Sequence, residues 1–378
     1  MKTRYTSYVL MMGLLLGGFI APLGAQQSQG WVLETALHYG QLLKHTPKLR
    51  FEVDQPSAAF ELLFRRQTFG DRTWQAEQGY PMLGFSLMAY RMAPNDLLGN
   101  AYSLAPNLST YLFRRKKWNA QFMFGYGLAY LDRTFDLDNN PQNNAIGSHL
   151  NVTVKLRFAA NVRLSPHWGL HTGFSFTHYS NGASQLPNLG LNIPAMVLGL
   201  RYTPRPWTET RYTHLDGKRP PPKRRWGAHG SLGLGLRERG AAGGPRNPIY
   251  LATAAVTYAN AKFNRFMLGA EFEFNRGVFL FGQHVGEFEN RQEALRRSMR
   301  WMLFVGDELQ YHNFSISMQV GFYLHPVYLG VFPLSTRFGV RYYLPPLRSS
   351  EGRFYLALQL KSHLIIAEYF SFSGGVRF

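Results

Sequence analysis

A strict alternation of apolar and polar residues limits how this chain can fold more than any other feature. In residues 119–131 large apolar side chains occupy most even positions, while the odd positions carry mostly small or polar ones. The same period of two recurs in residues 150–160 and 314–324. Because successive side chains of a strand point to opposite faces of a sheet, this period predicts β-strands with one apolar and one polar face.

The residues on the apolar face distinguish a membrane barrel from a soluble β-sandwich, which also alternates. This face is rich in Phe, Tyr and Leu, and the chain contains 29 Phe and 21 Tyr. The opposite face is small, polar or charged, as in barrels whose apolar side faces lipid. No run of about 18 apolar residues, the length of a spanning helix, follows residue 25. We therefore predict an all-β protein, a transmembrane antiparallel β-barrel, in which the terminal Phe378 lies on the apolar face.

Two strand arrangements are compatible with this pattern. Eight alternating segments lie on each side of a Pro- and Arg-rich stretch at residues 205–225. Both halves end in Gly-x-Arg-aromatic, at residues 199–202 and 375–378, which indicates an internal repeat. Two tandem eight-stranded barrels, at residues 26–204 and 226–378, would explain the stretch as a linker. One sixteen-stranded barrel would need it as an unusually long turn.

The first 25 residues have the features of a cleaved signal peptide. Lys2 and Arg4 precede a short apolar stretch at residues 9–20, and Ala25 supplies the small residue at the cleavage point. Together with the barrel pattern, this predicts the outer membrane of a Gram-negative-type bacterium. With the N-terminus in the periplasm, odd-numbered strands would run outward, so the seventh would end near the outer leaflet.

Composition excludes several kinds of catalytic and metal-binding site. The chain has no Cys, which excludes disulfide scaffolds, thiol catalysis and thiolate metal sites. Its 12 His show no metal-ligand spacing, so we expect no metal and no cofactor.

The net charge of +19 suits contact with anionic lipid in an exported protein, and we expect no nucleic-acid partner. We interpret the basic run at residues 114–117 as a solvated turn on the periplasmic side, with contact to anionic headgroups as the alternative.

Charged residues also occur at positions that face the barrel interior. An eight-stranded barrel has an interior filled by side chains. We expect the charges at these positions to pair with one another and to leave no wide pore. In the first half they include Glu34, Glu61, Lys155, Arg157 and Arg201.

The segment from residue 176 to 192 differs from the other strand ends. His178 and Ser180 are two residues apart, so on a strand they share a face, and that face is the lipid-facing one. Asn192 has the same outward parity on the next strand. Polar groups facing hydrocarbon are costly and indicate function, and a Ser beside a His has the parts for nucleophilic attack on an ester. The alternative is a pair of interfacial polar residues that contact headgroups.

The residues His178-Tyr179-Ser180-Asn181, followed by Gln185, Pro187, Asn188 and Gly190, resemble the active-site segment of the PagL-type lipid A 3-O-deacylases. The resemblance implies an eight-stranded outer-membrane barrel that hydrolyses the acyl ester at the 3 position of lipid A. Lipid A, or lipopolysaccharide, and outer-membrane lipid would then be its partners. Ser180 would be the nucleophile and His178 the general base, while Asn181, Gly182 and Asn188 would stabilise the oxyanion or hold the substrate.

One position departs from the family pattern. The family places a Glu twelve residues after the Ser to orient the His, and this chain has Asn192 there. Either Asn192 orients the imidazole, or the site has decayed and the protein is a structural or channel-forming barrel. The second half carries no such site, because Leu364 and Ile366 align with His178 and Ser180. We therefore expect the second barrel to be non-catalytic.

Overall fold

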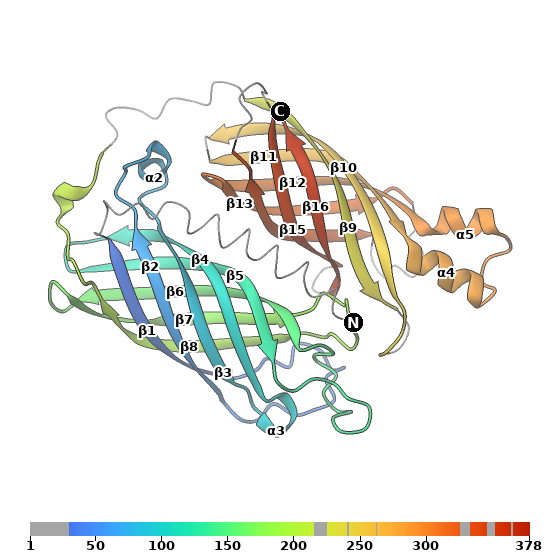
Figure 1. Cartoon of the computed structure of the whole chain (residues 1–378), viewed down its shortest axis with the longest axis horizontal. Helices are drawn as coiled ribbons and strands as arrows, with labels where there is room; N and C mark the ends of the chain where they lie inside the picture. Colours follow the sequence, from blue (N-terminus) through green and yellow to red (C-terminus); the bar gives the residue numbers. More distant parts are fainter. Residues whose placement is uncertain are drawn as a thin grey trace. The chain divides into compact units, whose positions relative to one another are not determined.

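The computed structural model describes residues 30–214, 225–239, 242–261, 263–325, 333–345, 352–363 and 366–378. These residues form two closed antiparallel barrels of eight strands each (Figure 1). The fold-class prediction is confirmed, and the alternative of one sixteen-stranded barrel is wrong. The predicted signal peptide lies outside the described residues. Among the described helices, none is long and apolar enough to cross a membrane.

The first barrel closes because its eighth strand pairs with its first. Each strand pairs with the next one in the chain, and β1 pairs with β2 on one side and with β8 on the other. Two short helices lie in its connections, α2 (Thr73–Glu77) and α3 (Asn95–Leu98). Its strands are β1 (Trp31–Gly40), β2 (Ser57–Gln67), β3 (Met82–Arg91), β4 (Asn100–Arg114), β5 (Trp118–Leu131), β6 (Leu150–Arg163), β7 (Trp168–Ser180) and β8 (Leu191–Tyr202).

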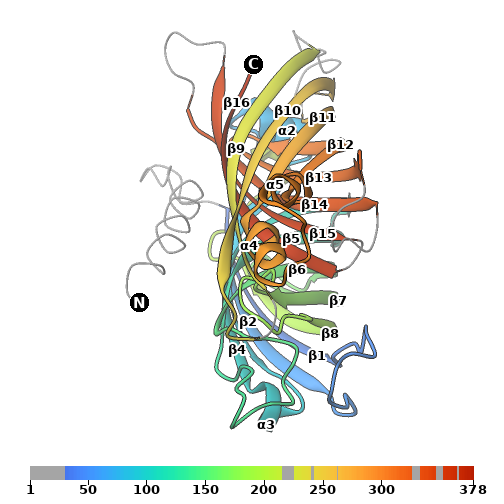
Figure 2. The same ribbon diagram turned by 90° about the vertical axis from the view of Figure 1, so that its right-hand side faces the viewer.

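The second barrel repeats this topology, and β9 pairs with both β10 and β16. The alternation had indicated only strands here, but the β11–β12 connection forms two helices, α4 (Arg276–His284) and α5 (Arg291–Ser298). Figure 1 shows both helices beyond the strand ends, and Figure 2 shows them next to each other, in agreement with their contacts. The strands are β9 (Trp226–Glu238), β10 (Arg246–Ala261), β11 (Asn264–Asn275), β12 (Met299–Tyr311), β13 (Phe314–Tyr323), β14 (Leu334–Tyr343), β15 (Arg353–His363) and β16 (Ile366–Arg377).

The exterior of both barrels is apolar. On β7, Trp168 and Phe174 are exposed, whereas His171 and Tyr179, at positions of the opposite parity, are buried. Exposed Leu, Phe and Trp side chains recur on the strands of the second barrel as well. An apolar exterior around a polar interior is the arrangement of a barrel solvated by lipid.

The interior of the first barrel holds the ion pairs that strand parity predicted. Buried Glu34 accepts hydrogen bonds from Arg65, from Arg157 Nη2 at 2.9 Å and from Arg201 Nε at 2.7 Å. Buried Glu61 accepts one from Lys155 Nζ at 3.0 Å. A buried charge is tolerated when it is paired and hydrogen-bonded, so Glu34 is the acceptor on which three arginines depend.

This dependence gives a stability prediction. Glu34→Gln removes the counter-charge of Arg65 and Arg201 and leaves Arg157 with Glu61 alone, at 3.8 Å. We expect it to lower the free energy of unfolding of the first barrel by about 3–5 kcal/mol. Urea titration in detergent micelles, followed by the mobility of unheated protein on gels, measures this loss. Glu52→Gln is the matched control, because Glu52 pairs with Lys44 at an exposed position. We expect the control to lose less than about 1 kcal/mol, and equal losses would contradict the assignment.

Candidate active site

Three polar residues lie at one end of the first barrel, at strand positions whose side chains alternate toward the outer face. His178 and Ser180 are the third-last and last residues of β7, and Asn192 is the second residue of β8. The strand register pairs His178 directly with Asn192, while Ser180 pairs with Val152 of β6. His178 and Asn192 are half-buried and Ser180 is buried. The barrel register therefore brings together two residues that are fourteen positions apart in the chain.

A hydrogen bond between these paired residues sets the state of the imidazole. His178 Nδ1 lies 2.6 Å from Asn192 Oδ1. An amide oxygen can only accept, so the imidazole donates its Nδ1–H. The neutral ring then carries its lone pair on Nε2, which is the state a general base requires. Asn192 thus fixes the tautomer and the orientation of the ring without adding a charge.

Gly190 passes close to the edge of this imidazole. Its φ of +79° is in the left-handed region that glycine adopts most readily. A Cβ at Gly190 would lie 3.0 Å from His178 Cε1 and 3.8 Å from Nε2. Any larger residue would therefore be strained and would push against the ring. Sequence reasoning included Gly190 only as part of the resemblance and gave it no role.

Two other connections hold the segment that carries Gly190 and Asn192. From the β1–β2 connection, Leu43 N–H donates to Asn192 O at 2.8 Å and His45 Nε2–H donates to Leu189 O at 3.1 Å. From the β5–β6 connection, Ala145 O accepts from Gly190 N–H at 3.0 Å. An apolar cluster lies at this end of the barrel and includes residues of the same connections. Its buried members are Leu42, Leu49, Phe51, Ala59, Met88, Tyr90, Met92, Leu98, Ala101, Ala129, Leu131, Ala145, Ile146, Tyr179, Leu191 and Ile193.

The residues expected around an oxyanion lie in the β7–β8 connection. Asn181 N–H donates to Asn188 Oδ1 at 3.0 Å, and Asn181 Nδ2 donates to Gln185 O at 2.8 Å. Gly182 has a φ of +60°, which suits the turn after β7. Asn181 and Asn188 therefore bond to each other across the turn, and the Asn181 N–H would have to leave Asn188 to meet an oxyanion.

A second set of serine and histidine, this one with a glutamate, lies inside the first barrel, and sequence reasoning missed it. Ser175 Oγ is 2.9 Å from His38 Nδ1, and His38 Nε2 is 3.1 Å from Glu61 Oε2. All three are buried, and Glu61 also holds Lys155. This set faces the ion-paired interior, so lipid does not reach it. Strand parity could have placed all three residues inside, but it could not have placed His38 next to Ser175, because their strands are not paired neighbours.

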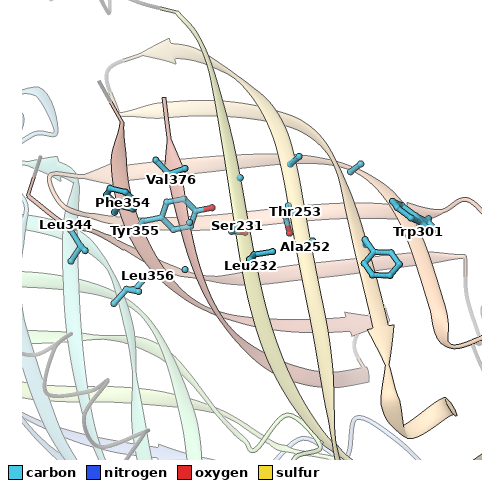
Figure 3. Close-up of a pocket in the computed structure, with 16 residues that line it drawn as sticks. Ser231, Leu232, Ala252, Thr253, Trp301, Leu344, Phe354, Tyr355, Leu356 and Val376 are labelled. Atoms are coloured by element: carbon cyan, nitrogen blue, oxygen red, sulfur yellow. The ribbon is translucent and has the colours of Figure 1, made fainter. Parts of the chain in front are cut away.

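One groove lies on the exterior of the second barrel (Figure 3) and has a volume of about 860 Å³. Small outward residues form its floor, among them Gly230, Ala252 and Gly374, and bulky ones such as Trp301 and Phe354 flank it. Among its described lining residues there is no carboxylate, imidazole, amine or guanidinium, and so none that could act as a general base. Within the described residues, no group of three or more His, Asp or Glu could hold a metal ion.

Family models match both halves of the chain. The model "Lipid A 3-O-deacylase (PagL)" matches residues 58–201, and the model "Acyloxyacyl hydrolase, C-terminal domain" matches residues 226–378. The chain belongs to the PagL-type family. The first model includes His178, Ser180 and Asn192, so this family match and the hydrogen-bonded pair fall on the same barrel. No curated protein sequence matches the chain.

Among solved structures, the chain is similar to outer-membrane barrels. The outer membrane enzyme PagL is 18% identical over 44% of this chain and 97% of its own, with a TM-score of 0.31. Neisserial surface protein A is 10% identical over 46% of this chain and 96% of its own, also with a TM-score of 0.31. At these scores the structural likeness adds nothing to the family models.

The hydrogen bond to Asn192 predicts one imidazole tautomer. In ¹⁵N-histidine NMR of the protein in micelles, we expect His178 in the Nδ1–H form, because Asn192 Oδ1 accepts that proton. Asn192→Leu removes the acceptor, and we expect the ring to become a mixture of tautomers. A His178 resonance of the Nε2–H form in the unsubstituted protein would contradict this geometry.

Proposed function

We propose that the first barrel is an outer-membrane esterase that removes the acyl chain ester-linked at the 3 position of lipid A. The observation that carries this proposal is the His178–Asn192 hydrogen bond on the outward side of a strand end, two residues before Ser180. A base and a hydroxyl on the lipid side of a barrel suit a substrate that is itself a lipid. The family match to lipid A 3-O-deacylases supports the substrate class.

The proposed reaction has two steps. His178 Nε2 takes the proton of Ser180 Oγ while the oxygen attacks the ester carbonyl, and the resulting imidazolium returns the proton to the departing 3-hydroxyl oxygen of the sugar. Water then hydrolyses the acyl–Ser180 ester by the same route, releasing the fatty acid. In both steps Nδ1–H stays bonded to Asn192, which keeps Nε2 directed for proton transfer.

The oxyanion of each step needs hydrogen-bond donors that match its position. We assign this role to the β7–β8 connection, with Asn181 N–H as the first donor. It would exchange Asn188 Oδ1 for the substrate oxygen. Asn188 and Gly182 would then shape the turn around the substrate, as the resemblance implies.

The second barrel is non-catalytic in this proposal. Ile366, which aligns with Ser180, is an exposed apolar residue at the start of β16. The interior holds an ion network instead, in which Lys361 and Arg300 both pair with Glu273. These contacts support a structural role for this half.

Two serines of the same strand test the proposal. Ser180→Ala removes the nucleophile, and we expect hydrolysis to fall by at least about 10³-fold. Ser175→Ala is the matched control, because Ser175 is hydrogen-bonded to His38 and faces the interior. We expect it to keep most of the activity. Mass spectrometry of lipid A from cells making each protein measures the loss of one 3-linked acyl chain, and equal activity with and without Ser180 would refute catalysis.

The decayed-site hypothesis is favoured by Asn192 in place of a glutamate, and substitutions at this position separate the two ideas. If Asn192 orients the base, Asn192→Ala lowers the rate by about 10–10²-fold, and Asn192→Glu changes it little. If the site has decayed, the unsubstituted protein is inactive and Asn192→Glu restores hydrolysis. Rates on purified lipid A in micelles, with unheated gel mobility as the folding control, distinguish these outcomes.

A further inference from the structure

A small basic pocket lies at the end of the first barrel where β7 begins, opposite to the end that carries Ser180. Its volume is about 80 Å³, room for a few waters or one compact anion. The β4–β5 and β6–β7 turns form much of its rim, and Arg163 N–H joins them by donating to Lys117 O at 2.8 Å. Residues of interior parity, including Arg201, form part of its lining. The pocket is therefore the mouth of the barrel at this end.

Positive charge dominates this pocket. Five of its lining cations form no ion pair with any carboxylate of the described residues, whereas Arg201 pairs with Glu34. Among the lining residues that the structure describes, Glu209 is the one carboxylate. Unpaired cations converging on one cavity favour an anionic ligand. The five are Arg114, Arg115, Lys116, Lys117 and Arg163.

Arg114 is the cation that the fold positions most firmly. Its guanidinium lies 3.8 Å from the ring centre of Tyr111 and 4.7 Å from that of Tyr212. Both rings contact the guanidinium through their π faces. Its Nη2 is buried and has no hydrogen-bond partner among the described residues. A buried donor without an acceptor is costly, and an anion oxygen would satisfy it.

Part of the stretch between the barrels builds the opposite wall. Thr213 N–H donates to Phe69 O at 2.8 Å, and Trp207 Nε1–H donates to Tyr212 OH at 3.2 Å. Burial raises the pKa of the Tyr212 hydroxyl, so this ring stays neutral beside Arg114. Residues that the sequence suggested as linker therefore fold back as an aromatic wall of the pocket.

The pocket is also continuous with the lipid-facing surface. Trp118 and Trp168 line it, and 45% and 49% of their surfaces are exposed. Half-exposed tryptophans at strand ends mark the boundary between hydrocarbon and headgroups. We propose that this pocket binds the phosphate of an anionic phospholipid in the leaflet opposite the one that Ser180 faces. A free phosphate would use the cations but not the adjoining apolar surface.

The test uses the full chain in detergent micelles and native mass spectrometry. We expect phosphatidylglycerol to remain bound, and diacylglycerol, which has the same chains without a phosphate, to be lost. The substitutions Arg114→Gln, Lys116→Gln and Lys117→Gln, made together, should weaken phosphatidylglycerol binding by at least about tenfold. Lys44→Gln, Lys48→Gln and Arg50→Gln remove the same charge at the other end and should change binding less than about twofold.

Two further results decide the assignment. The mobility of unheated protein on gels shows whether the triple variant is folded. If it is unfolded, the single variant Lys116→Gln replaces it, because Lys116 lies at an exposed turn position. We expect this single variant to bind phosphatidylglycerol measurably more weakly than the unsubstituted protein. Binding unchanged in a folded pocket variant, or equal retention of diacylglycerol, would overturn the proposal. Displacement of the lipid by millimolar inorganic phosphate would overturn the lipid assignment, because it would show that the phosphate alone is the ligand.

Discussion

Every backbone N–H and C=O within hydrocarbon must find its partner inside the protein, and this requirement shapes the whole chain. A β-sheet meets it only when its edge strands pair with each other. In the first half β8 meets this need by pairing with β1, and in the second half β16 pairs with β9. Closure after eight strands fixes which side of each strand faces lipid and which faces the interior. It also makes both interiors narrow enough for side chains to fill.

The filled interiors give the candidate site a rigid support. In the first barrel the carboxylates of Glu34 and Glu61 tie arginine and lysine side chains from several strands together. Such a network holds the register of the strands, and the register is what sets His178 opposite Asn192. The face that carries the candidate site and the face that carries the buried charges are thus the two sides of the same paired strands.

The two sets of serine and histidine in the first barrel differ in their environment. Ser175, His38 and Glu61 have the hydrogen-bond order of a hydrolase triad, including the carboxylate that the outward site lacks. They face an ion-paired interior, where the carboxylate already balances Lys155. His178 and Ser180 have the lipid-facing parity that a lipid substrate requires, with an amide in place of the carboxylate. A set of catalytic side chains must be accessible to its substrate as well as correctly arranged.

The sequence by itself determined the strands, their faces and the outward parity of His178, Ser180 and Asn192, because a period of two is a local property of the chain. It also identified the interior charges, since their parity opposes that of the aromatic residues. Only the tertiary structure decided between one barrel and two, because closure depends on which distant strands pair. The contact of Gly190 with the imidazole, the buried Ser175–His38 pair and the pocket around Arg114 also belong to the tertiary structure. Each joins segments whose separation along the chain carries no local signal.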